Sequence, residues 1–239
     1  MKIKLWKKGI MLTVALALTA ALSFTAFAAE PEDTVPQETS PGSAWQNPFE
    51  DVRVSDWFYH NVEYAYVNNL FSGTGAATFS PNTPMTRGML VTVLGRMSGT
   101  DVSGYVSSFD DVPDGAYYAK YTEWAREKGI VSGVGDNRFA PDTSISRQDM
   151  TVMLARYATV MGLEAPAMST GVAFTDAESI AAYAQDAATA MQKAGIISGK
   201  PGGVFDPKAG ATRAEVSAML HRFMLLFSNV EDAVEGVRP

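Results

Sequence analysis

The sequence predicts an all-α fold in which three tandem two-helix repeats form a pseudo-threefold trimeric arrangement around a central helix bundle. A motif that begins Phe-x-Asp recurs three times along the 239 residues. Each copy contains two stretches with the apolar spacing of a helix that faces a core. A unit of about 60 residues buries too little surface to be stable alone, whereas three units can bury their apolar helices against one another.

The repeat is visible as a set of positions that keep their register. The first two copies are 60 residues apart, and the third follows after a further 65 or 66 residues. The predicted repeats are residues 48–107, 108–170 and 171–229, followed by a C-terminal tail at 230–239. The positions held in register in the three copies include Phe49/Phe109/Phe174, Asp51/Asp111/Asp176, Phe79/Phe139/Phe205, Arg87/Arg147/Arg213 and Arg96/Arg156/Arg222.

The segment before the repeats predicts export. Four lysines, an apolar run and Ala26-Phe27-Ala28 make residues 1–28 a signal peptide that is cleaved after Ala28. Residues 29–47 are rich in Pro, Glu, Thr and Ser without periodicity, which predicts a flexible linker. No later segment has the length and apolarity of a membrane span, so none is expected after cleavage.

Composition excludes several function classes. Removal of residues 1–28 leaves 15 basic and 26 acidic residues, a net charge of −11, which disfavours nucleic acid as a partner. There is no cysteine, and the two histidines lie in different repeats. No metal site, cofactor or catalytic residue is therefore expected.

Each copy predicts two helices with defined ends. The first helix is expected at 57–69, 117–128 and 180–193. Gly129 and Gly195 follow two of these helices at the position that favours a left-handed residue, with Asn69 in the first copy. The second helix begins at Thr86, Ser146 or Thr212, and its apolar side chains recur at core-facing spacing.

These motifs together resemble those of the surface-layer homology (SLH) domain family. The residues that carry the resemblance are Phe109-Asp110-Asp111-Val112, Tyr117-Tyr118, Gly129 to Gly133, Phe139-Ala140-Pro141 and Thr212-Arg213-Ala214-Glu215. The resemblance covers residues 48 to about 228. It implies binding grooves between adjacent lobes and, as ligand, a secondary cell-wall polysaccharide that often carries a pyruvate ketal, or another peptidoglycan-linked glycan.

The arginine of each second helix is a candidate ligand contact. Thr212 and Glu215 form a capping box, and Ser146 with Asp149 is a shorter version. Arg87, Arg147 and Arg213 then stand at the first helical position, where a guanidinium and a helix N-terminus together suit a carboxylate. Gly88 and the missing acidic partner weaken the first copy. The alternative is that each arginine is ion-paired with Asp51, Asp111 or Asp176 of a neighbouring repeat.

Aromatic and acidic side chains complete the predicted glycan site. Trp57 and Tyr117 could stack on sugar faces, and Tyr183 approaches the same position, whereas Phe58 and Tyr118 favour the core. The third copy has Ala181-Ala182 where its aromatic pair should begin, which predicts an impaired groove. Asp51, Asp111 and Asp176 either bind sugar hydroxyls or cap the first helix, with equal support.

The predicted function is a secreted, non-catalytic module that anchors to the cell wall or S-layer. A small SLH adaptor that tethers another envelope protein is the alternative. A wall-processing hydrolase is disfavoured because the repeats leave no segment to carry a catalytic pair.

Overall fold

The computed structural model describes residues 45–164 and 166–235, with side chains described as far as Phe227. The predicted signal peptide and most of the predicted linker lie outside these residues. The repeats lie in one compact unit that begins at Asn47. Within the described residues the chain forms α-helices, one 3-10 helix and isolated β-bridges, but no strand. The prediction of an all-α fold is confirmed.

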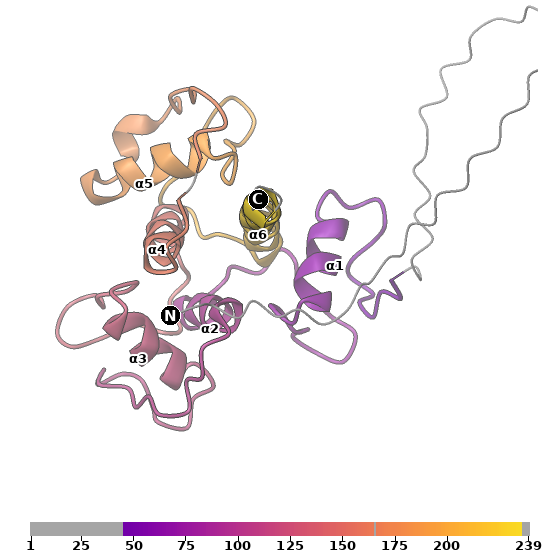
Figure 1. Ribbon diagram of the computed structural model, residues 1–239. Coiled ribbons are helices and arrows are strands. Elements are labelled where there is room, and N and C mark those ends of the chain that lie inside the picture. Colours follow the sequence, from indigo (N-terminus) through magenta and orange to yellow (C-terminus); the bar gives the residue numbers. More distant parts are fainter. Residues whose placement is uncertain (1–44, 165, 236–239) are drawn as a thin grey trace, which may run out of the picture. The chain divides into compact units, whose positions relative to one another are not determined.

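Six α-helices follow the predicted order, two in each repeat. They are α1 (Tyr59–Val67), α2 (Arg87–Ser98), α3 (Ala119–Glu127), α4 (Arg147–Val160), α5 (Ala182–Lys193) and α6 (Arg213–Glu235), with a 3-10 turn at Ala177–Ser179 before α5. Figure 1 shows α2, α4 and α6 end-on in the middle, with α1, α3 and α5 outside them. The second helix of every repeat is therefore central and the first is peripheral.

The first helices begin two residues later than predicted. In the first repeat Tyr59 N–H donates to Asp56 O at 2.9 Å, so a turn precedes α1. The residues before α1 and α3 are Phe58 and Tyr118, and both are buried, which confirms their predicted place in the core. At the other end Asn69, Gly129 and Gly195 have φ values of +57°, +73° and +71°. This left-handed residue, directly after the C-cap residue of each helix, is as predicted.

The second helices begin and pack as the sequence predicts. Thr86 and Ser146 Oγ accept hydrogen bonds from the backbone of Met89 and Asp149. Two equivalent positions in α2, α4 and α6 are fully buried in all three helices, which places the core between them. Burial of each such side chain contributes about 1.5–3 kcal/mol. These positions are Leu90, Met150 and Val216, and Leu94, Leu154 and Leu220. The last helix, α6, continues to Glu235, into the segment predicted as a tail.

A ring of backbone hydrogen bonds joins the three segments that precede the central helices. Met85 N–H donates to Ala211 O at 2.8 Å, Ala211 N–H to Ile145 O at 3.0 Å, and Ile145 N–H to Met85 O at 2.8 Å. All three residues are fully buried. Each repeat therefore bonds to both others, which is the connectivity that the predicted pseudo-threefold arrangement requires.

Each peripheral helix packs against the central helix of a different repeat. The pairs in contact are α3 with α2, α5 with α4, and α1 with α6. Glycines allow one of these approaches. A Cβ at Gly88 would lie 2.9 Å from Tyr118 Cδ1, and a Cβ at Gly95 would overlap the Tyr121 ring. Gly88 therefore admits the α3 aromatics to α2, although it lowers helix propensity.

Candidate functional site

The repeated aspartate holds the loop that carries the repeated phenylalanine. Asp111 Oδ1 and Oδ2 accept the backbone N–H groups of Phe139 and Ala140, each at 2.8 Å. Asp51 and Asp176 make the equivalent pairs of bonds in their repeats. The second residue of each pair has a left-handed backbone, with φ of +58° at Ser80, +56° at Ala140 and +56° at Asp206. Two charge-assisted hydrogen bonds offset the cost of that conformation.

This arrangement corrects one of the two roles predicted for the aspartates. The residues that precede α1, α3 and α5 are Phe58, Tyr118 and Ala181, and none caps its helix with a side chain. The aspartates therefore do not cap the first helix. Burial alone raises the pKa of Asp111 and of Asp176, but the backbone hydrogen bonds outweigh it, so both pKa values lie below their ordinary range.

The same phenylalanine binds an arginine from a neighbouring repeat. Arg87 Nε donates to Phe139 O at 2.9 Å, Arg147 Nε to Phe205 O at 2.8 Å, and Arg213 Nε to Phe79 O at 2.8 Å. Each guanidinium also lies over the ring of the phenylalanine that it bonds, 4.4 to 5.5 Å from the ring centroid. Such a cation–π contact adds to the bond.

We call each set of aspartate, phenylalanine and arginine a clamp, named after its arginine. The aspartate binds the phenylalanine N–H within one repeat, and the arginine binds its carbonyl from another. A clamp therefore fixes the loop and joins two repeats at one phenylalanine. The three clamps are Asp111–Phe139–Arg87, Asp176–Phe205–Arg147 and Asp51–Phe79–Arg213.

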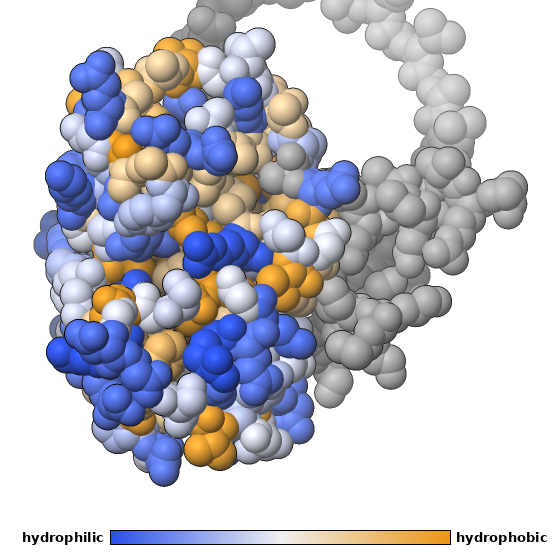
Figure 2. Space-filling model, turned by 90° about the vertical axis from the view of Figure 1, so that its left-hand side faces the viewer, coloured by the Kyte–Doolittle hydropathy of each residue, from blue (hydrophilic) through white to orange (hydrophobic). Residues whose placement is uncertain are grey.

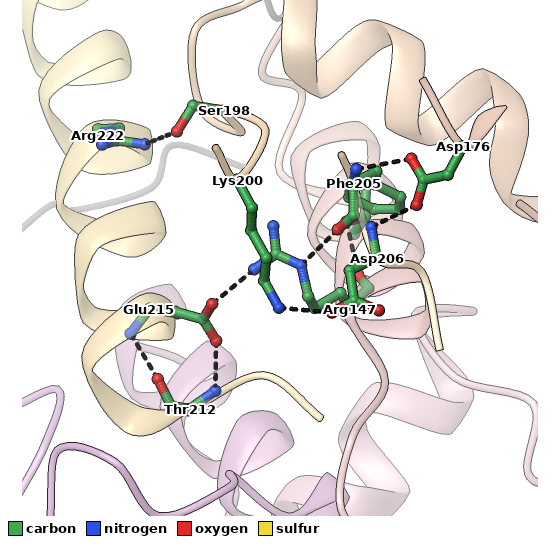
Figure 3. A network of polar contacts seen from close by, with 10 residues as sticks. Arg147, Asp176, Ser198, Lys200, Phe205, Asp206, Thr212, Glu215 and Arg222 are labelled. Carbon is green, nitrogen blue, oxygen red and sulfur yellow. Dashed lines mark hydrogen bonds and ion pairs between the residues drawn. The ribbon is translucent and has the colours of Figure 1, made fainter. Parts of the chain in front are cut away.

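The clamps differ in what neutralises the arginine. Arg147 is 2% exposed and donates from Nη1 to Glu215 Oε1 at 3.1 Å, as Figure 3 shows. The position that Glu215 occupies beside Arg147 is occupied by Asp149 in the Arg87 clamp and by Met89 in the Arg213 clamp. No carboxylate among the described residues lies within ion-pair distance of Arg213. Its Nη2 donates instead to Ser72 O at 2.7 Å.

Exposure separates the arginines in a second way. Arg147 and Arg213 are buried, and burial lowers the pKa of Arg213 to about 10. Arg87 is partly exposed. Its neighbour Asp149 accepts instead from Ser146 Oγ at 2.6 Å. The arginine with the weakest helix cap is therefore the one that solvent reaches most readily.

Exposed aromatic residues lie at one equivalent position in all three repeats. Trp57 is 64% exposed, and Tyr117 and Tyr183 are each 58% exposed. Tyr183 provides this aromatic in the third repeat, for which the sequence predicted an impaired groove. Its hydroxyl donates to Asp149 Oδ1 at 2.6 Å and accepts from Gln148 Nε2 at 2.9 Å. Burial and then the bond to Asp149 raise the pKa of Tyr183 to about 12.

These aromatics lie near clamps that other repeats build. The charge of Arg87 acts on Tyr183, and the charge of Arg213 acts on Tyr117. The structure thus groups Arg87 with Asp111 and Tyr183, and Arg213 with Asp51 and Tyr117. Each group takes one residue from each repeat. Sequence reasoning selected all of these residues but missed the phenylalanine carbonyl that joins them, because a backbone acceptor has no residue signature.

Metal-ligand clusters and long apolar helices are both absent from the described part of the chain. No group of three or more His, Cys, Asp or Glu side chains there could hold a metal ion. Likewise, none of its helices combines the length and apolarity that crossing a membrane requires.

Fold and clamps together define a module of three tandem helical repeats that bond to one another in a ring. The family model described as the S-layer homology domain matches residues 48–88, 108–151 and 173–217. The chain belongs to this family of cell-surface anchoring modules, as the repeat motifs predicted.

Curated relatives share the module within longer proteins. The chain is 29% identical over 220 residues to an endoglucanase of Bacillus sp. (strain KSM-635), an alignment that covers 92% of this chain and 22% of that protein. It is 31% identical over 127 residues to a cellulosome-anchoring protein of Acetivibrio thermocellus, an alignment that covers 50% of this chain and 28% of that protein. For a surface-layer 125 kDa protein of Lysinibacillus sphaericus the identity is 30% over 112 residues, covering 45% and 10%. The chain thus spans less than a third of each relative.

Proposed function

We propose that this chain is a secreted, non-catalytic module that anchors to the bacterial cell wall by binding a pyruvylated secondary cell-wall polysaccharide in grooves between its repeats. The observation that carries the proposal is the exposed aromatic at the same position of all three repeats. Tyr183 and Tyr117 each lie within electrostatic range of an arginine of another repeat, Arg87 and Arg213 respectively. An aromatic face binds a sugar ring through its apolar C–H surface, and a guanidinium binds a carboxylate.

The structure supports a division of roles within this site. Asp51, Asp111 and Asp176 already use both carboxylate oxygens on loop backbone, so in the proposal they position the loop. Trp57, Tyr117 and Tyr183 provide the sugar platforms. Arg87 is the arginine best exposed to a pyruvyl carboxylate, whereas Arg147 and Arg213 act mainly by holding the repeats together.

Sedimentation with purified wall sacculi tests the proposal. The mature chain should sediment with the sacculi, and removal of the secondary polymer should abolish this. The triple variant Trp57→Ala/Tyr117→Ala/Tyr183→Ala should lose binding at least tenfold and keep its helical circular dichroism. Tyr105→Ala, in the connection between the first two repeats, is the matched control and should bind normally. Undiminished binding of the triple variant would refute the aromatic platforms.

The ligand chemistry needs a separate titration. A pyruvylated N-acetylmannosamine fragment should bind more tightly than the same sugar without pyruvate, and Arg87→Gln should remove most of that difference. Retained binding to stripped peptidoglycan would assign another glycan instead. A zymogram that shows no clearing is expected of a non-catalytic module. Co-purification of an envelope protein only with wall-bound chain would support the adaptor alternative, for which the cellulosome-anchoring relative is the precedent.

A further inference from the structure

A depression in the second repeat borders the Arg87 clamp but is lined by other residues. Its volume is about 660 Å³, and none of its lining residues belongs to a clamp. Arg126, Arg138 and Arg156 all line it. Figure 2 looks onto the side of the molecule that carries α3 and α5, and strongly hydrophilic side chains gather over its lower half, where α3 lies in Figure 1. Three cations around one hollow are unusual on a chain of net charge −7.

The first arginine of the depression is held in place. Arg126 Nε and Nη2 donate to Glu123 Oε1 at 2.9 and 2.5 Å. The other Glu123 oxygen accepts from Ser108 N and Oγ, both at 2.9 Å. Glu123 has a side chain only 6% exposed, whereas that of Arg126 is 41% exposed. A buried carboxylate thus fixes a guanidinium that still faces solvent, and pre-orientation of this kind lowers the entropy cost of binding.

The other two arginines are weakly neutralised. Arg138 Nε lies 3.5 Å from Asp111 Oδ2, an oxygen that already accepts the Ala140 N–H, and its side chain is 62% exposed. Arg156 Nη1 approaches Ile130 O at 3.5 Å and forms no ion pair among the described residues. Both guanidinium groups therefore have donor capacity for an added anion.

Comparison among the repeats separates the structural arginine from the other two. Arg156 has equivalents in Arg96 and Arg222, and Arg96 Nη1 approaches Leu70 O at 3.4 Å just as Arg156 approaches Ile130. This position therefore serves the fold. Arg126 and Arg138 correspond to Tyr66 and Thr78 in the first repeat and to Gln192 and Val204 in the third. The repeat folds without these two arginines, so the fold does not explain them.

We propose that this depression binds an acidic sugar unit, one that carries a phosphate or a carboxylate, as a site separate from the grooves between repeats. The three guanidinium groups would bind the anion, and Ser132 offers a hydroxyl to the sugar. Asn137 offers only its side-chain carbonyl oxygen, because its Nδ2 already donates to Ser108 O and Asp110 Oδ1, each at 2.8 Å. Phe109 and Val131 supply an apolar wall. The second repeat alone combines these features, so one such site per chain is expected.

A swap of residues between repeats tests the site without disturbing the fold. Arg126→Tyr/Arg138→Thr gives the second repeat the residues of the first. The mature chain is titrated with N-acetylglucosamine 6-phosphate, with glucuronic acid and with neutral N-acetylglucosamine. At least one anionic sugar should bind with a Kd at least tenfold below that of the neutral sugar, and should weaken as salt rises. The swap should raise that Kd at least tenfold. Arg96→Gln, the matched control, should leave it unchanged.

The outcomes separate this site from the proposed wall-binding grooves. The triple aromatic variant should keep its affinity for the anionic sugar while it loses binding to the sacculi. The arginine swap should lose its affinity for the anionic sugar while it still binds the sacculi. Tighter binding of the phosphate ester assigns a phosphate, and tighter binding of glucuronic acid assigns a carboxylate. Equal binding of the neutral sugar, no binding of either anion, or an unchanged Kd in the swap would each overturn the proposal.

Discussion

The Arg147 and Arg213 clamps have the same backbone geometry, but only Arg147 has an ion-pair partner among the described residues. In both, a buried arginine donates to a phenylalanine carbonyl at 2.8 Å and lies over the ring of that phenylalanine. Arg147 is ion-paired with Glu215 at 3.1 Å, whereas Met89 stands at the equivalent position for Arg213. The arginine therefore serves the fold without an ion-paired carboxylate. Asp149 and Glu215, the acidic residues at this position of α4 and α6, adjust charge and capping.

The largest expected effect comes from removal of the carboxylate at the Arg147 clamp. Glu215→Gln leaves a buried guanidinium without its counter-charge and weakens the Thr212 capping box. Glu215 is itself 20% exposed, so the free energy of unfolding should fall by about 2–3 kcal/mol rather than the full cost of a buried pair. Urea denaturation followed by circular dichroism measures it.

Asp149→Asn is the matched control at the equivalent residue of α4. Because its neighbour Arg87 is partly exposed, the loss should be about 1 kcal/mol or less. Equal losses in the two variants would show that the buried ion pair of Glu215 adds no stability beyond its contribution to capping.

The aspartate that completes the Arg147 clamp predicts a pH dependence. The pKa of Asp176 is lowered in the folded chain, so its contribution to stability is complete above the ordinary aspartate pKa of 3.8 and is lost as pH falls through the folded value. Asp176→Asn removes one of two hydrogen-bond acceptors and should cost about 1–3 kcal/mol at pH 7.

Measurement of unfolding free energy between pH 2 and 6 checks the sign. The wild-type chain should lose stability below about pH 4, and the difference from Asp176→Asn should shrink there. A constant difference across this range would mean that the Asp176 charge contributes nothing to the clamp.

Most of the fold could be predicted from sequence because periodicity and repeat register report it directly. Leu90, Met150 and Val216 recur at equivalent helical positions and are all fully buried in the core. Asn69 was recognisable as a left-handed residue because few side chains tolerate that conformation. The helix pairing was less accessible, since α3 packs on α2 through Gly88 and Gly95, and a glycine on a helix reads from sequence as a weakness.

The candidate site was only partly predictable for a physical reason. A repeated arginine and a repeated aspartate suggest either a ligand site or an ion pair between them. The sequence could not show that both side chains bind the backbone of the same phenylalanine. Tyr183 illustrates the second difficulty. The change in repeat spacing hides its equivalence to Tyr117, and only the structure shows that both are 58% exposed.

A carboxylate placed next to Arg213 should stabilise the protein. Met89→Glu supplies the capping-box partner for Thr86 and the counter-charge that Glu215 supplies to Arg147. The free energy of unfolding should rise by about 1 kcal/mol. Met89→Gln provides the cap without the charge and separates the two contributions. A loss of stability in both variants would show that the packing of the Met89 side chain contributes more stability than the added cap.

A comparably small effect is expected at the aromatic of the third repeat. Tyr183→Phe keeps the ring but removes the hydroxyl that joins Asp149 to Gln148. Stability should fall by about 0.5–1.5 kcal/mol. Tyr117→Phe should change it less, because no hydrogen bond of the Tyr117 hydroxyl is found among the described residues. If the bridged hydroxyl also holds the ring rigid as a sugar platform, Tyr183→Phe should weaken wall binding severalfold, whereas Tyr117→Phe should not. Equal binding by the two variants would show that both rings act only through their exposed faces.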